Sequence, residues 1–267
     1  MDFVRKEHYG PQDLVEIIRL LRAPGGCPWD RAQTHASIRM NFIEETYEAV
    51  EAIDAGDSEM LQEELGDVLM QIALHAQMEA EAGRFDFCDV CDRVCKKLIY
   101  RHPHVFGTLQ VEGAEQVLQN WDELKKKEKH QGTAASNLGA VPVTLPGAMR
   151  AAKLQKRAAG WGLGWQDTAD ALDTLQQAGR QLGAAQSDAD KQSAAMALLF
   201  AAVGAVRAAG LDPELALTRA SEGFTRAVAA EEQPLAEQGG FAALSEQDKQ
   251  NLWRRIIMFP NGENLSL

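Results

Sequence analysis

The sequence predicts an all-α fold, and three observations lead to that prediction. Apolar residues recur at the three- and four-residue spacing of a helix face, as in Leu14, Ile17, Ile18 and Leu21. Proline and glycine gather in short segments between such stretches and rarely occur inside them. No segment shows the apolar–polar alternation that is typical of a strand, so helices packed on helices are expected.

Five helices are expected in the N-terminal half. After the first, two prolines and two glycines at 23–30 predict a loop. Thr34 or Ser37 is a candidate cap for the second helix, and Asp57 or Ser58 for the third. The expected helices span 12–23, about 35–54, 57–82, 86–101 and 113–129.

The composition changes at 131–147, where Gly, Ser, Thr and Pro predict a linker. Beyond it the chain is rich in Ala, and its periodicity predicts five more helices. These span 148–159, 167–184, 188–209, 213–232 and 245–257. The expected organisation is therefore a domain at 1–130, a linker at 131–147 and a second domain at 148–267.

The charge balance limits the classes of partner. The formal net charge of −12 argues against bulk binding to nucleic acid or to an anionic membrane surface. No run of about 18 apolar residues occurs, so no membrane span is expected. The N-terminal residues do not resemble a signal peptide, and a cytoplasmic location is predicted.

Acidic residues at helical spacing form the most informative stretch of the chain. Glu44, Glu45 and Glu48 form an EExxE pattern, and Glu64 and Asp67 form an ExxD pattern. A turn near residue 56 would make the two helices antiparallel. In such a hairpin, the residue numbers of two residues that face each other have a constant sum, here 112, which is twice 56. Glu48 therefore faces Glu64, and Glu45 faces Asp67. The pattern therefore predicts four carboxylates that meet as a square.

Such a square is unfavourable without a counter-charge, since like charges at helical spacing cost about 0.2–0.5 kcal/mol per pair even when exposed. Oxygen ligands with no His or Cys nearby suit Mg²⁺, with Mn²⁺ as an alternative. A solvated acidic face is the other interpretation of EExxE. Apolar neighbours such as Ile43, Tyr47 and Leu65 argue against it. A di-iron site normally requires Glu-x-x-His pairs, which neither acidic motif supplies.

Three of the four cysteines read C-x2-C-x3-C, at Cys88, Cys91 and Cys95. This spacing places them on one helix face with no obvious fourth ligand. Reduced, partly buried cysteines are the favoured interpretation, and a zinc or iron–sulfur site is the alternative.

Four motifs in order closely resemble the MazG family of nucleoside triphosphate pyrophosphohydrolases. They are Gly-Gly-Cys-Pro-Trp-Asp-Arg-Ala-Gln-Thr-His at 25–35, EExxE at 44–48, Glu-Glu-Leu-Gly-Asp at 63–67 and Arg-His-Pro-His-Val-Phe-Gly at 101–107. The resemblance implies an enzyme that hydrolyses nucleoside triphosphates to the monophosphate and pyrophosphate, by attack of water on the α-phosphorus. It also implies two tandem MazG-like helical bundles.

The second half departs from the family pattern. We align the second half with the family pattern by counting from Trp165. Gln177, Ala178 and Gln181 then stand where the EExxE acids would be, and Ala194 and Ala197 stand where the ExxD acids would be. These side chains cannot replace four carboxylates around a cation. The resemblance therefore implies a degenerate second bundle that keeps the helices without the metal site.

The resemblance also implies roles for individual residues. Glu45, Glu48, Glu64 and Asp67 would be metal ligands, whereas Glu44 would hold a further cation or act as general base. Trp29 is a candidate for base stacking or for core packing, and Asn41 for contacting sugar or base. Candidates for binding phosphate are Lys97, Arg101 and His102, although surface charge or helix capping explains them equally well. Family members associate through their bundles, so a homodimer is expected, while a regulatory or nucleotide-binding protein with little turnover is the alternative.

Overall fold

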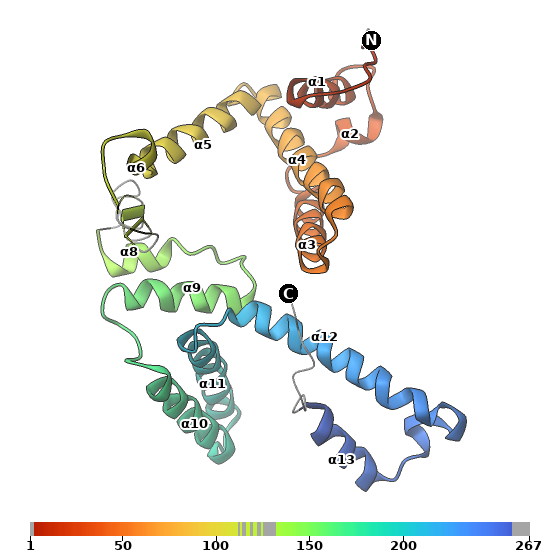
Figure 1. Ribbon diagram of the computed structural model, residues 1–267, viewed down its shortest axis with the longest axis vertical. Helices are drawn as coiled ribbons and strands as arrows, with labels where there is room; N and C mark the ends of the chain where they lie inside the picture. Colours follow the sequence, from red (N-terminus) through yellow and green to blue (C-terminus); the bar gives the residue numbers. More distant parts are fainter. Residues whose placement is uncertain are drawn as a thin grey trace. The chain divides into compact units, whose positions relative to one another are not determined.

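The computed structural model describes residues 3–111, 113, 116–117, 120–121, 124 and 132–257, apart from the side chains of 236–238. These residues form helices and turns with no β-strand, which confirms the all-α prediction (Figure 1). The chain divides into two compact units between Leu124 and Lys125. No single helix in the described part is long and apolar enough to cross a membrane, and one bent pair, Asp188–Ala208 with Pro213–Leu235, meets the length and composition criteria only together.

The helices of the first unit match most of the expected ranges. They are α1 (Pro11–Arg22), α2 (Pro28–Ala32), α3 (Arg39–Ala55), α4 (Ser58–Glu81), α5 (Phe87–Arg101) and α6 (Pro103–Phe106). The short helices α2 and α6 lie where a loop and a helix end were expected. Both begin at a proline, which is tolerated at the first helical position because its missing N–H has no helical partner there. The helix expected at 113–129 falls largely outside the described residues.

Helices α3 and α4 form a long antiparallel hairpin (Figure 1). Gly56 ends α3 in the left-handed conformation at φ 66°, which a residue with a side chain rarely adopts. The Asp57 side chain then accepts hydrogen bonds from the backbone N–H groups of Glu59 and Met60, which caps α4. This turn determines which residues of α3 face which residues of α4.

The core of the first unit lies away from that turn. Ile18 of α1 packs with Ile38 and with Ala73, Leu74 and Met78 in the C-terminal half of α4. Helix α1 therefore covers one end of the hairpin, and the half nearer Gly56 is left outside this core. The acidic motifs lie in the half that the core leaves uncovered.

The second unit also contains a long antiparallel hairpin, formed by α10 and α11. Its elements are α8 (Ala134–Gly139), α9 (Gly147–Ala159), α10 (Thr168–Ala184), α11 (Asp188–Ala208), α12 (Pro213–Glu232), two 3₁₀ segments, η1 (Gln233–Gln238) and η2 (Gly240–Ala243), and α13 (Glu246–Ile257). Helix α8 lies inside the segment expected as a linker. Thr133 caps it, and its Asn137 and the following Val141 are buried, because α8 packs against α9.

Candidate active site

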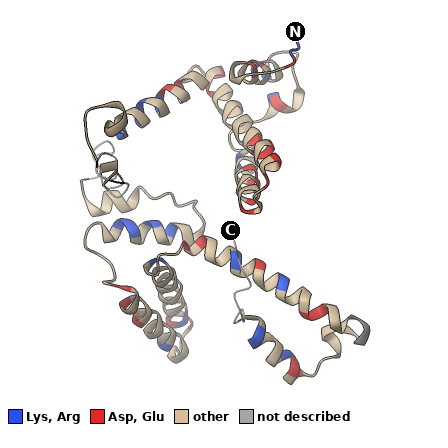
Figure 2. Cartoon of the chain, viewed as in Figure 1, with Lys and Arg blue, Asp and Glu red and all other residues tan. Residues whose placement is uncertain are grey.

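The α3–α4 hairpin brings together acidic residues from both motifs. One carboxylate oxygen from each of Glu45, Glu48 and Glu64 lies within 4.8 Å of the other two. Asp67 is near enough for its charge to act on Glu45 and Glu64. Among the described residues, no other set of three His, Cys, Asp or Glu side chains meets the same geometric test. We refer to Glu45, Glu48, Glu64 and Asp67 as the acid cluster (Figure 2).

The electrostatics of the acid cluster favour a bound cation. Burial raises the pKa of Glu45, and the charges of Asp67 and Glu48 raise it further. Burial, followed by the charges of Glu48 and Asp67, also raises the pKa of Glu64. The ionised forms are therefore disfavoured together, and a divalent cation would stabilise them. The cluster offers carboxylate oxygens alone, and this donor set fits a hard divalent ion.

Gln71 is a member of this site that the sequence did not single out. It lies one turn beyond Asp67 on α4, and only 4% of its surface is exposed. Its side chain donates a hydrogen bond to Glu45 and so lowers the pKa of that carboxyl group. Its Oε1 is buried without a hydrogen-bond partner in the described structure. A glutamine among Met70, Ile72 and other apolar residues was the signal that could have identified it.

A hydrogen-bonded chain extends along the same face of α4. The Nδ1 atoms of His35 and His75 lie 2.7 Å apart, and His35 Nε2 lies 2.7 Å from Glu79 Oε1. Arg84 donates two hydrogen bonds to Glu79 and holds the pKa of that carboxyl at about 2, with a further contribution from His35. Burial and the neighbouring His35 lower the pKa of His75. This chain fixes the segment before α3 onto α4, and thereby the position of α3.

Two candidate substrate residues lie on the elements that precede the acid cluster. Trp29 is on α2, and 60% of its surface is exposed, so it is not a core-packing residue in this structure. Asn41 is partly buried in the first turn of α3, one turn before Glu45. Both residues precede the acids in the chain, and no contact of either with the acid cluster is part of the described structure.

The other three candidates lie on or just after α5, which extends from the end of α4 that is distant from Gly56 (Figure 1). Arg101 is buried, and its guanidinium carbon lies 5.3 Å from the ring centre of Trp121. His102 Nδ1 lies 2.6 Å from the carbonyl oxygen of Leu98, so the ring caps the helix. Lys97 is exposed. In this structure Arg101 and His102 thus make local, structural contacts.

The cysteines of α5 differ from the expectation in one respect. Cys88, Cys91 and Cys95 are reduced and exposed, where partial burial was expected. The apolar residues Val94, Leu98 and Ile99 of the same helix are exposed as well, and among its described residues only Phe87, at its start, packs against the core of the first unit.

The contact between Gln71 and Glu45 leads to a testable prediction. Gln71→Leu should weaken the binding of a divalent cation to the acid cluster by about 10- to 100-fold, as titration calorimetry would measure, because this range is typical of residues that orient a metal ligand. Its free energy of unfolding should change little, because the substitution also removes a buried, unpartnered oxygen. Gln77→Leu, on an outer turn of α4, is the control. A loss of stability in Gln71→Leu as large as its loss of cation-binding free energy would contradict a positioning role.

Comparison with known proteins identifies one matching family and several similar proteins. The MazG nucleotide pyrophosphohydrolase domain matches residues 33–106. A nucleoside triphosphate pyrophosphohydrolase of Escherichia coli K12 is 36% identical over 252 residues, which cover 91% of this chain and 95% of the relative. A Thermotoga maritima protein named nucleoside triphosphate pyrophosphohydrolase/pyrophosphatase MazG is 37% identical and covers 80% of this chain and 82% of its own length. The uncharacterized protein YabN of Bacillus subtilis is 41% identical over 89% of this chain and 49% of its own length.

Proposed function

The chain belongs to the MazG nucleotide pyrophosphohydrolase family, and we propose on that basis that it hydrolyses nucleoside triphosphates at the α-phosphate in a Mg²⁺-dependent reaction. The products would be a nucleoside monophosphate and pyrophosphate. The acid cluster is the observation that carries this proposal. A divalent cation would relieve the repulsion among three carboxylates that lie within 4.8 Å of one another, and proteins bind a triphosphate together with such a cation.

The acid cluster supplies the ligands in this proposal. Glu45, Glu48, Glu64 and Asp67 would hold Mg²⁺, and Mn²⁺ would suit the same oxygen donors. An ion held by these residues would neutralise charge on the phosphate oxygens and lower the pKa of the attacking water. Glu44 is exposed and one helix position away from Glu45, so it would hold a further cation or accept the proton of the attacking water. Gln71 would keep the Glu45 carboxylate oriented toward the ion.

Trp29 and Asn41 are proposed to bind the nucleoside. The exposed indole of Trp29 offers a face on which a base can stack. Asn41 lies one turn before Glu45 and would contact the sugar or base. Lys97, Arg101 and His102 remain candidates for the phosphates, with the positive charge of exposed Lys97 the most accessible of the three.

Hydrolysis in ¹⁸O-labelled water tests the proposed point of attack. We expect one labelled oxygen in the monophosphate and none in pyrophosphate, as mass spectrometry of the products would show. Label in pyrophosphate, or release of inorganic phosphate, would contradict attack at the α-phosphorus. The reaction should stop with EDTA and resume with Mg²⁺.

We further propose that the enzyme acts on the cytoplasmic nucleotide pool, either in its regulation or in the removal of unwanted nucleotides. A steady-state comparison of ordinary ribonucleotides, deoxynucleotides, and oxidised or deaminated forms tests this role. A preference in kcat/KM for the modified forms supports removal, whereas equal values across the set support regulation of the bulk pool.

A homodimer is proposed from the apolar face of the first hairpin. Ile43, Tyr47 and Val50 recur along one side of α3, and Leu65 and Leu69 of α4 lie at the same level. All five are substantially exposed, and Tyr47 is 54% exposed. Apolar residues at this helical spacing typically mark a face that packs against another helix. A second copy of the hairpin would cover this face and complete a four-helix bundle.

We predict that light scattering during size exclusion gives the mass of a dimer at micromolar concentration. Tyr47→Glu should shift the protein to a monomer, because the dimer would bury the new charge without a partner. Glu59→Lys, an exposed substitution at the start of α4, should leave the dimer intact. A monomeric wild-type protein would contradict the proposed interface.

A further inference from the structure

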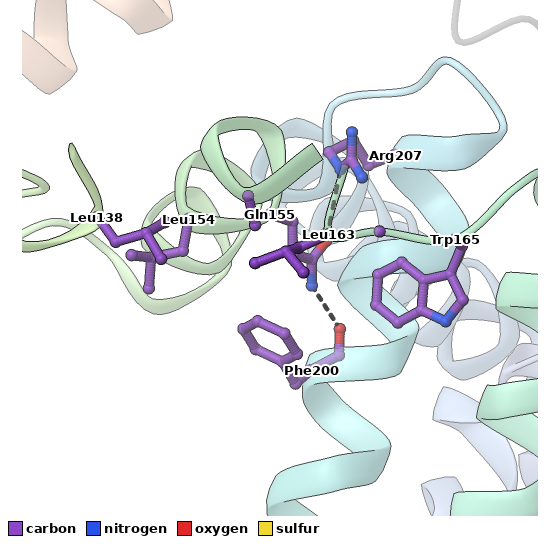
Figure 3. A pocket seen from close by; sticks show the side chains of 9 residues that line it. Leu138, Leu154, Gln155, Leu163, Trp165, Phe200 and Arg207 are labelled. Atoms are coloured by element: carbon purple, nitrogen blue, oxygen red, sulfur yellow. Dashed lines mark hydrogen bonds between the residues drawn. The ribbon is translucent and has the colours of Figure 1, made fainter. Parts of the chain in front are cut away.

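The second unit contains a pocket that the proposed reaction does not use. It has a volume of about 420 Å³, within the range of small-molecule sites. Its walls come from α8, α9, the loop before α10, and α11 (Figure 3). The lining is mainly apolar, with two aromatic rings and one cation. Its main contributors are Leu138, Leu154, Leu163, Trp165, Phe200 and Arg207.

Trp165 is held in place by the protein. Its indole N–H donates a 2.9 Å hydrogen bond to Thr174 Oγ1. Its ring lies so close to Gly204 of α11 that a Cβ atom there would be 2.3 Å from the ring. Phe200 also lines the pocket and is 44% exposed (Figure 3). The pocket thus has one fixed ring and one accessible ring, which suits a planar aromatic ligand.

One cation lies at the pocket beside these rings. The buried side chain of Gln155 donates a 2.8 Å hydrogen bond to the carbonyl oxygen of Phe200 (Figure 3). Its Oε1 accepts a longer, 3.5 Å hydrogen bond from Arg207 Nε. Within the described structure, no carboxylate pairs with Arg207, which is partly buried. A guanidinium in this setting is well suited to an anionic group, which it can bind through two parallel N–H donors.

The charge of the surrounding wall favours the same kind of ligand. Helix α9 carries Arg150, Lys153, Lys156 and Arg157 and no acidic residue (Figure 2). None of the four forms an ion pair within the described part of the chain. Helix α9 thus brings four positive charges to this side of the unit, and the one carboxylate among the described residues that is bound to it, that of Glu214, accepts a hydrogen bond from the Met149 N–H at its start.

We propose that this pocket binds a nucleoside monophosphate, with the base against Trp165 and Phe200 and the phosphate on Arg207. A monophosphate fits better than a triphosphate, because the pocket lining has no carboxylate to share a divalent cation with a polyphosphate. The second unit would then be a nucleotide-binding unit separate from the acid cluster. The binding of a monophosphate in this pocket does not depend on the proposed function. Only the statement that this ligand is also a product of the protein's own reaction rests on it.

Titration calorimetry of the full chain in EDTA tests the site, with AMP, GMP, CMP and UMP as probes. We expect one monophosphate bound per chain, and the same affinity in Glu45→Gln. Arg207→Met should weaken binding by about 10- to 100-fold, the usual effect of losing a hydrogen bond to a charged group. Arg180→Met, an exposed change on α10 outside the pocket, should have no effect. Adenosine should bind at least tenfold more weakly than AMP.

Two substitutions of opposite charge at Leu163 test the site independently of Arg207→Met, in which a loss of binding would also follow from misfolding. Leu163 is 60% exposed and lines the pocket, so it tolerates a charged side chain. Leu163→Glu should abolish monophosphate binding, and Leu163→Lys should preserve or strengthen it. The proposal is overturned if no monophosphate binds at millimolar concentration, or if Leu163→Glu and Leu163→Lys bind equally. It is also overturned if Glu45→Gln abolishes binding, which would place the ligand at the acid cluster. Because the assay involves no turnover, it can succeed even if the proposed hydrolysis is not found.

Discussion

Glu45→Gln should reduce nucleoside monophosphate formation by at least about 100-fold. The substitution keeps the size of the side chain and removes one charge from the acid cluster, where Glu45 lies within 4.8 Å of Glu48 and Glu64. A catalytic metal supplies several kcal/mol of charge stabilisation, and each 1.36 kcal/mol corresponds to about tenfold in rate. Steady-state kcat/KM at saturating Mg²⁺ measures the loss. Asp67→Asn should behave similarly, because the charge of Asp67 acts on both Glu45 and Glu64.

Glu51→Gln provides the matched control. Glu51 lies on the same helix, is exposed, and belongs to no cluster of possible metal ligands in the described structure. The same chemical change there should leave kcat/KM within about twofold, since an exposed charge outside the cluster interacts only weakly with it through water. If Glu45→Gln retained more than half of the activity, the acid cluster would not be the catalytic site.

The acid cluster could be foreseen because it depends on local rules. Helical spacing places Glu45 and Glu48 on one face, and a turn at Gly56 fixes which residues of the next helix oppose them. The helix face on which a residue lies, and the residue that opposes it on the next helix, can both be read from residue numbers. Gln71 was not foreseen, because only the packed structure shows that its side chain is buried and donates to Glu45. A glutamine in a sequence is usually an exposed residue.

Contacts between distant segments were the least predictable part. His35 precedes α3 and pairs with His75 and Glu79 on α4, and its place near the start of a predicted helix gave no indication of these partners. The residues of helix α8 were likewise predicted to be part of a linker. The prediction missed this helix because its stability depends on packing against α9 more than on its own composition. In the second unit, the uncharged side chains at 177, 178, 181, 194 and 197 could be read directly from the sequence, whereas the pocket beside Trp165 depends on the close approach of its ring to Gly204.

Mg²⁺ should raise the melting temperature of the protein, and the size of the increase should depend on pH. Burial and like charges raise the pKa of Glu45 and Glu64 above the ordinary value of 4.5. The folded state therefore binds these protons more tightly than the unfolded state. Their contribution to stability is present at low pH and is lost as the pH rises through the raised pKa values. As the pH rises, Glu45 and Glu64 lose these protons and their mutual repulsion grows, so an added cation has more repulsion to offset at high pH than at low pH.

Ligand present at 100 times its dissociation constant stabilises a folded protein by about 2.7 kcal/mol, which corresponds to roughly 5–10 °C for a protein of this size. Differential scanning calorimetry should show that shift at pH 7.5 and a smaller one at pH 5. In Glu64→Gln the metal-free protein should melt at a higher temperature than wild type, because one repulsive charge is gone, and its Mg²⁺ shift should largely disappear. Glu51→Gln should keep the wild-type shift. If Mg²⁺ did not raise the melting temperature of the wild-type protein, or raised it more at pH 5 than at pH 7.5, the acids would not bind the ion together. The reason is that the repulsion that destabilises the metal-free cluster is also what gives the cation its affinity.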